Sequence, residues 1–230
     1  MTHVIAEISN QHEGNLERAK ELILAAKAAG AWAVKGQAIA RGSGDMRAYG
    51  MMPEKFYDQC AFSFDQYREL ITFGEENSIP VFFSVISSSL RNLRRYQPYQ
   101  KLWASDTDQC DSRRLGRFDR EKCFISMTQP KLNYRLSRLP TILYASRYQL
   151  DVDIEGYEAM VKYYDRPIGI SHHAKSHDNL TKLARAYHIP VIEKHFHLAG
   201  CQVLYDKILY RDCIHAYGPK KFSELVKELS

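Results

Sequence analysis

The chain has 230 residues, of which 45% are hydrophobic and 26% are charged. This is the composition of an ordinary globular protein, and it excludes the collagenous, disordered and disulfide-framework classes. Lysine and arginine (32 residues) exceed aspartate and glutamate (27 residues), and the net charge of +5 suits an anionic small substrate. The basic clusters at 91–95 and 113–120 could form a nucleic-acid patch. They are more typical of solvated helix faces, so we expect no nucleic-acid partner.

The cysteines and the start of the chain indicate a reducing compartment. The five cysteines are odd in number, and none forms a CxxC pair. The chain opens Met1-Thr2-His3 and enters an apolar run at Val4, without a basic leader region. No uninterrupted apolar stretch reaches the roughly 18 residues that a membrane-spanning helix needs. We therefore expect reduced thiols, no membrane association and a cytoplasmic location.

Short apolar runs alternate with amphipathic stretches along the first half. Strands are expected at 4–8, 33–37, 81–84 and 100–104, and helices at 15–29, 63–76 and 89–96. Asn15 is expected to cap the first helix and Gly30 to end it. A longer loop containing Gly42, Gly44 and Gly50 should follow the second strand.

The second half repeats this alternation. Strands are expected at 122–127, 141–146, 167–171 and 190–196, and helices at 132–139, 154–164, 179–187 and 220–229. Strict alternation predicts a parallel sheet, and eight units predict an α/β fold of the (β/α)8 TIM-barrel type. We expect residues 1–230 to form a single barrel domain. An open doubly wound sheet is the competing fold, but no GxGxxG motif follows the first strand.

Polar residues interrupt the predicted strands near their carboxyl ends, where barrel active sites lie. Because burying unpaired charges is costly, so many of them at one rim indicate a reaction site rather than a core. Those considered are Glu7, Lys35, Gln37, Lys101, Ser105, Asp106, Ser126, Tyr148, Ser171, His173, Glu193 and His195.

Two kinds of chemistry follow from these residues. His173 and His195, on neighbouring strands, could share a divalent metal ion, with His172, His197 or Glu193 as a possible third ligand. Separately, lysines and serines could surround a phosphate or a carboxylate. A metal beside an anion pocket suggests that carbon bonds are joined or cleaved in a phosphorylated or carboxylated substrate.

Four segments resemble the N-acetylneuraminate (sialic acid) synthase family. Ala6-Glu7-Ile8 followed by His12-Glu13-Gly14 is similar to the family's AEIG-x-NH-x-G start, and residues 31–37 (AWAVKGQ) to its GADAVKFQ. Residues 169–173 (GISHH) resemble the family's G-x-SDH, and residues 192–196 match its IEKHF.

The resemblance implies condensation of phosphoenolpyruvate with an N-acyl-hexosamine aldehyde. His173 and His195 would bind Mn2+ or Mg2+, and Glu7 and Asp106 would handle protons. Gln37, Tyr148 and Asp206 would hold the sugar. The phosphoenolpyruvate ligands would be Lys35, Lys101, Ser105, Ser126 and Ser171.

The sequence also departs from the family. The family appends an antifreeze-like domain, which supplies an arginine to the partner's sugar pocket. We expect no such domain in this chain, so a homodimer or a separate antifreeze-like protein is an expected partner. The family's GPDH segment reads Leu204-Tyr205-Asp206-Lys207. One alternative is therefore a barrel without turnover that binds sugars or anions or acts as a scaffold. Another is a different metal-dependent barrel, such as an isomerase or an endonuclease-like hydrolase.

Overall fold

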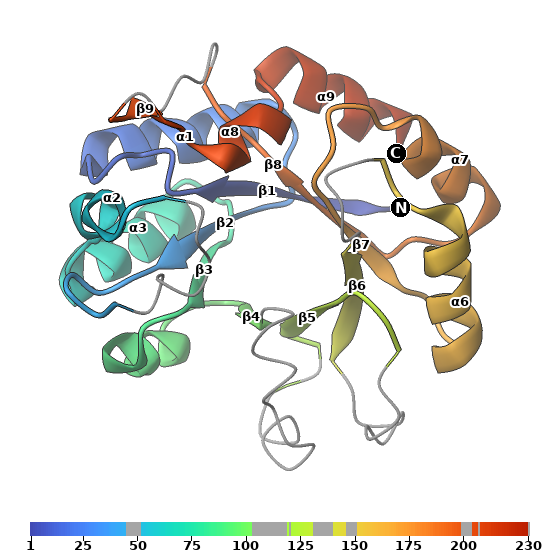
Figure 1. Ribbon diagram of the computed structural model, residues 1–230, viewed down its shortest axis with the longest axis horizontal. Coiled ribbons are helices and arrows are strands. Elements are labelled where there is room, and N and C mark those ends of the chain that lie inside the picture. Colours follow the sequence, from blue (N-terminus) through green and yellow to red (C-terminus); the bar gives the residue numbers. More distant parts are fainter. Residues whose placement is uncertain are drawn as a thin grey trace.

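The computed structural model describes residues 1–44, 52–102, 119, 121–130, 140–145, 151–198, 204–206 and 208–229. Eight parallel strands form an almost closed barrel with helices around the outside, as the TIM-barrel prediction requires (Figure 1). The sheet order is β3-β2-β1-β8-β7-β6-β5-β4. The strands are β1 (His3–Ser9), β2 (Ala33–Ala38), β3 (Val81–Val85), β4 (Gln100–Leu102), β5 (Cys123–Met127), β6 (Thr141–Ala145), β7 (Gly169–His172) and β8 (Val191–His195).

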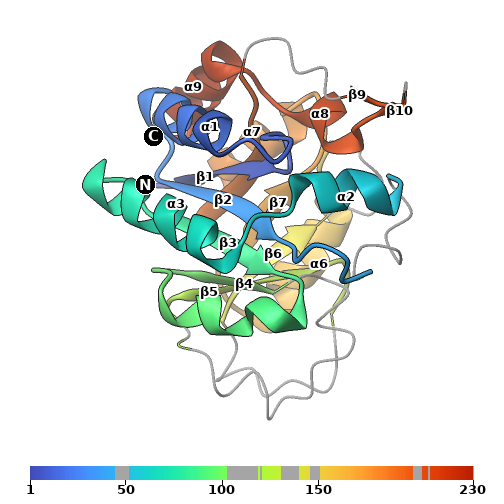
Figure 2. The same ribbon diagram turned by 90° about the vertical axis from the view of Figure 1, so that its left-hand side faces the viewer.

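The helices cover the outer face of the strands. Figure 2 shows α1 and α3 lying over β1, β2 and β3. As predicted, the Asn15 side chain caps α1 by accepting a hydrogen bond from the Arg18 N–H at 3.1 Å, and Gly30 ends the helix with a φ of +89°. The α-helices are α1 (Leu16–Ala28), α2 (Glu54–Cys60), α3 (Phe64–Glu76), α6 (Ile154–Tyr164), α7 (Asp178–Ala186), α8 (Arg211–His215) and α9 (Pro219–Glu228).

Several short elements differ from the sequence-based expectation. The segment expected to be a helix at 89–96 is a 3-10 helix, η2 (Ser88–Arg95), and α2 begins in what was expected to be a loop. After β8 the chain forms a small hairpin, β9 (Leu204–Tyr205) and β10 (Ile208–Leu209), and then α8. These elements are too short to give a periodic signal. The helix expected at 132–139 lies outside the described residues.

Alternate strand residues point into the barrel, because successive side chains of a strand face opposite sides. Six interior residues form a separate apolar cluster with Trp32 and Tyr99. The opposite faces of the strands pack against the helices, as Val4, Ala6 and Ile8 of β1 do. Beyond the apolar cluster, the interior positions nearer the carboxyl ends of the strands are polar. The six cluster residues are Ile5, Ala33, Phe82, Phe124, Leu143 and Val191.

A glutamine side chain joins β3 to the segment that leads into β4. The sheet order begins at β3 and ends at β4, so the ladder between these two strands is not closed. Gln97 Nε2 donates to the Phe83 carbonyl at 3.1 Å, and Gln97 Oε1 accepts from the Phe83 N–H at 3.1 Å. The amide of Gln97 therefore occupies the place of a strand residue at this seam.

One cysteine corrects the expectation of reduced thiols. Cys213 of α8 is disulfide-bonded, whereas Cys60 of α2 is a free, buried thiol. Among the helices that the structure describes, none combines the length and apolar character required to cross a lipid bilayer.

We expect Gln97→Leu to lower the free energy of unfolding by about 2–4 kcal/mol, because both buried main-chain groups of Phe83 would lose their partner. Urea denaturation measures this change. The exposed Gln59 of α2 offers a control, since Gln59→Leu should stay within about 0.5 kcal/mol of the parent. Equal effects of the two substitutions would show that the seam does not depend on Gln97.

Candidate active site at the barrel mouth

Four charged side chains form a continuous network inside the barrel, above the apolar cluster. Lys35 Nζ of β2 contacts Glu7 Oε2 of β1 and lies 3.3 Å from Glu193 Oε1 of β8. Glu193 Oε2 accepts a hydrogen bond from Lys101 Nζ of β4 at 2.8 Å. Ser171 Oγ of β7 donates to Glu193 Oε1 at 2.9 Å. All five residues are buried, so one carboxylate, that of Glu193, joins both lysines away from water.

Burial and pairing move the pKa values of this network in different directions. Burial raises the pKa of Glu7 to about 7, in spite of the neighbouring Lys35. Burial also lowers the pKa of Lys101 to about 8, although Glu193 opposes this. Although burial alone would raise it, Lys101 and Lys35 hold the pKa of Glu193 below its usual range. At neutral pH the carboxyl group of Glu193 is therefore ionised, whereas that of Glu7 is close to its pKa and can accept or release a proton.

The rings of His173 and His195 lie next to each other at the carboxyl ends of β7 and β8. Their centroids are 5.1 Å apart, with the ring planes inclined by 54°. Burial and the neighbouring ring of His195 lower the pKa of His173 to about 3, and burial lowers the pKa of His195 to about 4. Both imidazoles are therefore neutral at pH 7, which is the form that binds metal ions.

This pair fits a divalent metal ion. Because a metal–imidazole bond is about 2.0–2.1 Å long, rings at this separation can share one ion. His195 Nδ1 is buried without a hydrogen-bond partner among the described residues, as expected of a nitrogen that awaits a ligand or water. In the part of the chain that the structure describes, no group of three His, Cys, Asp or Glu side chains is arranged to hold a metal ion. Two of the residues considered as a third ligand interact with other groups. Glu193 is paired with the lysines, and His172 Nε2 lies 3.2 Å from Asp151 Oδ1.

A further carboxylate, Asp212 of α8, acts electrostatically on both rings. Its Oδ2 accepts hydrogen bonds from Ser9 Oγ and, at 2.7 Å, from Tyr210 Oη. Although burial alone would raise it, His195 and these hydrogen bonds lower the pKa of Asp212. Asp212 is therefore ionised at neutral pH beside the histidine pair.

Ser9 links Asp212 to the charged network. The register of β1 shifts between Glu7 and Ser9, and Ser9 has a φ of +49°, which is unusual for a residue with a side chain. In this conformation the Ser9 N–H donates to Glu7 Oε1 at 2.7 Å while its hydroxyl donates to Asp212. The irregular end of β1 thus connects the two parts of the site.

Gln37 lies on the same face of β2 as Lys35, one step nearer the mouth. Asn10 Nδ2 donates to Gln37 Oε1 at 2.6 Å and lies 3.3 Å from Tyr210 Oη. The amide oxygen of Gln37 is therefore engaged. Its Nε2 is the end that can donate to a ligand.

The other sequence-predicted residues are placed as follows. Ser126 is buried in β5, two residues beyond the interior Phe124 and on the same face. Asp206 is exposed in the turn between β9 and β10. Ser105, Asp106 and Tyr148 lie outside the described residues. The structure brings together Glu7, Lys35, Gln37, Lys101, Ser171, His173 and His195.

Sequence reasoning does not single out Asp212. The loop after β8 contains a hairpin of two-residue strands, and no periodicity predicts how such a segment folds back. The available signal is an acidic residue beside the buried Tyr210, shortly before the last helix. The pairing of Glu193 with two lysines is also missed, because spacing shows the face of a side chain but not its partner.

Comparisons with known proteins give the fold of the chain. No protein-family model and no curated protein matches the sequence. An N-acetylneuraminic acid synthetase from Leptospira borgpetersenii superposes with a TM-score of 0.75 at 19% identity, covering 99% of this chain and 82% of that one. A putative spore coat polysaccharide biosynthesis protein E from Chromobacterium violaceum gives 0.73 at 17%, covering 100% and 74%. A truncated 3-deoxy-D-arabino-heptulosonate 7-phosphate synthase from Thermotoga maritima gives 0.64 at 14%, covering 99% and 85%. At these identities, the likeness establishes that this chain shares their barrel fold.

Proposed function

We propose that the chain is a metal-dependent enzyme that condenses phosphoenolpyruvate with an N-acyl-hexosamine or a related sugar aldehyde. The products would be a sialic-acid-like (nonulosonic) acid and phosphate. One observation carries the proposal: two buried lysines joined by Glu193 and a pair of adjacent histidines converge at one barrel mouth. The shared fold with a sialic acid synthetase and a heptulosonate phosphate synthase supports it.

The lysine network suits a ligand with two anionic groups. Each lysine is fixed by Glu193 and keeps further ammonium hydrogens for a ligand that enters from the mouth. The hydroxyls of Ser126 and Ser171 line the same interior face. We assign the phosphate and carboxylate of phosphoenolpyruvate to these lysines and serines, together with Ser105.

The histidine pair suits the resident metal. His173 and His195 would hold Mn2+ or Mg2+, which when bound polarises the aldehyde oxygen of the acceptor. Asp212, tethered by Ser9 and Tyr210, stabilises positive charge at this position. The negative charge of Asp212 thereby favours the binding of a cation, rather than of an anion, at the histidines.

The reaction balances with a single water. Carbon 3 of phosphoenolpyruvate forms a bond to the aldehyde carbon, and the aldehyde oxygen takes up a proton. Water adds to carbon 2, and one of its protons balances the proton taken up by the aldehyde oxygen. The bond from carbon 2 to the phosphate oxygen then breaks, the second water proton leaves with the phosphate, and carbon 2 becomes the keto carbon of the product. Glu7, whose pKa lies at about 7, is suited to accept the proton from water. Asp106 is the second residue to which we assign proton transfer.

The acceptor is assigned to the side of the mouth formed by β1 and β2. Asn10 orients Gln37 so that Nε2 faces a ligand, and an amide donor of this kind recognises the carbonyl oxygen of an N-acyl group. Tyr148 and Asp206 are proposed to complete the sugar site.

His195→Ala should abolish metal-dependent phosphate release while the free energy of unfolding stays close to that of the parent. The wild-type protein, incubated with Mn2+, phosphoenolpyruvate and a panel of aldoses, is expected to release phosphate, measured colorimetrically. His188→Ala, at an exposed histidine, is the control. Binding of Mn2+ and phosphoenolpyruvate without release for any acceptor would favour a binding protein instead. Conversion of an aldose in the absence of phosphoenolpyruvate would indicate another reaction.

Phosphoenolpyruvate affinity should fall as the pH rises above about 8, because burial lowers the pKa of Lys101 to about 8 and the neutral amine attracts anions poorly. Lys101→Met should weaken binding by about 1.5–3 kcal/mol at pH 7 and remove this pH dependence. Calorimetry between pH 7 and pH 10 measures both effects. Lys122→Met, at an exposed lysine before β5, should change neither. A wild-type affinity that stays constant to pH 10 would contradict the assignment.

Turnover should decline as the pH falls below about 7, because Glu7 must be ionised to accept a proton and burial raises its pKa to about 7. Glu7→Gln should lower kcat by about 10²–10⁴-fold with little change in phosphoenolpyruvate affinity. Glu17→Gln on the exposed face of α1 should behave like the parent. A Glu7→Gln variant that keeps the acidic limb of the kcat profile would exclude Glu7 as the base.

A further inference from the structure

Tyr217, in the link between α8 and α9, is hydrogen-bonded to both segments that carry the histidine pair. Its N–H donates to the His195 carbonyl at 2.8 Å, and its own carbonyl accepts from the His197 N–H at 3.0 Å. Tyr217 thereby forms a parallel bridge with Phe196 and continues the sheet by one residue beyond β8. The backbone of His195 is held directly by this bridge.

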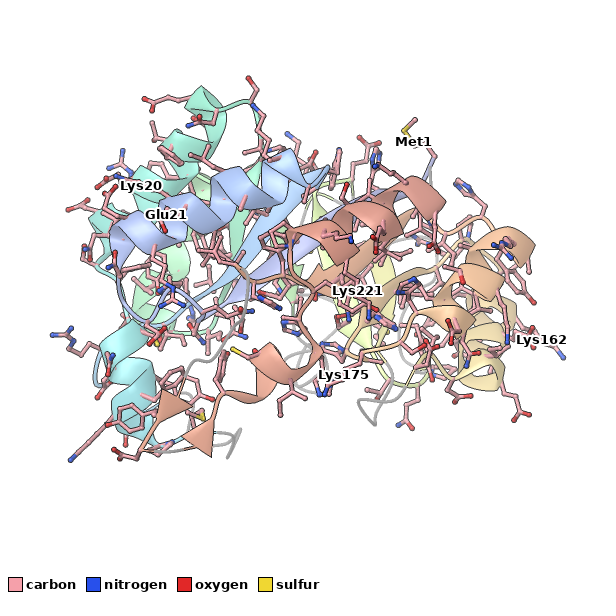
Figure 3. All side chains as sticks on the ribbon, turned by 90° about the horizontal axis from the view of Figure 1, so that it is seen from above. Met1, Lys20, Glu21, Lys162, Lys175 and Lys221 are labelled. Atoms are coloured by element: carbon pink, nitrogen blue, oxygen red, sulfur yellow. The ribbon has the colours of Figure 1, made fainter. Side chains whose placement is uncertain are left out.

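The side chain of Tyr217 reaches the segment that follows His173. Its hydroxyl donates to the Lys175 carbonyl at 2.9 Å and lies 2.9 Å from His177 Nδ1. Lys221 Nζ of α9 donates to the same Lys175 carbonyl at 2.6 Å, and Figure 3 labels both lysines on this side of the molecule. One tyrosine thus ties the chain just after His173 to the chain at His195.

A buried lysine reinforces this connection. Lys194 is completely buried on the outer face of β8, and its Nζ donates to the Ala174 carbonyl. The same Nζ lies 4.0 Å from the centroid of the Tyr217 ring. Two successive carbonyls after His173 are therefore bound, that of Ala174 by Lys194 and that of Lys175 by Tyr217.

The chain before His173 is fixed in a similar way. His172, on the outer face of β7, lies with its Nε2 3.2 Å from Asp151 Oδ1. Asp151 Oδ2 in turn accepts a hydrogen bond from the Asn179 N–H at the start of α7, at 2.8 Å. His173 is thus held on both sides by residues that do not enter the barrel.

We infer that Tyr217 and Lys194 are positioning residues that set the separation of His173 and His195, and hence the metal affinity of the pair. This inference rests on the proposed function, because it assigns the histidines to a metal. A side chain outside a metal site that fixes a ligand typically affects metal affinity about 10- to 100-fold. Neither residue is placed to contact substrate, so each acts through the backbone that carries a histidine.

The test compares two tyrosines whose hydroxyls donate hydrogen bonds to different parts of the chain. Tyr217→Phe removes the bond to the Lys175 carbonyl and keeps the ring. Tyr157→Phe removes a similar bond, since the buried Tyr157 hydroxyl donates at 2.9 Å to the Ile168 carbonyl at the opposite end of β7. We expect both variants to lose a comparable free energy of unfolding. We expect only Tyr217→Phe to weaken Mn2+ binding, about tenfold, as measured by the electron paramagnetic resonance signal of free Mn2+.

A second measurement and a second variant complete the test. Hydrogen exchange of the amides at 174–177 should accelerate in Tyr217→Phe and stay at the parental rate in Tyr157→Phe. If Tyr217→Phe does not fold, Lys194→Met is measured in its place, with the same expected loss of Mn2+ affinity. A folded variant that binds Mn2+ with the parental affinity would overturn this inference and leave the metal assignment unaffected. No Mn2+ binding by the wild-type protein would overturn the metal assignment and the inference together.

Discussion

The double pairing of Glu193 is the interaction on which the rest of the site depends. Two ammonium groups lie in a barrel interior floored by aromatic and aliphatic side chains, and one carboxylate contacts both of them. Removing one member of such a buried group leaves an uncompensated charge, which is far more costly than losing a surface ion pair. The lysines are therefore held in place before any ligand arrives, so binding of an anion would require little further ordering of the protein side chains.

The site combines residues carried by strands with residues carried by loops. Glu7, Lys35, Lys101 and Glu193 project from barrel strands, where packing against neighbouring strands fixes each side chain. Asp212 comes from a short helix after a hairpin, and hydrogen bonds from Ser9 and Tyr210 hold its carboxylate beside the histidines. The charged network is thus part of the strand scaffold, whereas Asp212 is carried by a connecting segment.

This division also explains what the sequence could predict. Short apolar runs predict all eight strands, and the alternation of side chains along a strand predicts which residues share a face, so the meeting of Lys35, Lys101, His173 and His195 was predictable. The pairing partners were not predictable, because strand periodicity places Glu193 inside the barrel but does not show that it binds two lysines. Asp212 was missed for a different reason. It follows strands of only two residues, which leave no pattern, whereas Asp206, six residues earlier, lies exposed in a turn.

The left-handed conformation of Ser9 has a consequence for how this protein can diverge. Its backbone N–H donates to Glu7 and its hydroxyl donates to Asp212, so one small residue connects the charged network to the carboxylate beside the histidines. A larger side chain has no free space at this fully buried position, which also forms the end of β1. Position 9 therefore tolerates few substitutions, because its backbone conformation, its burial and both hydrogen bonds constrain it at once.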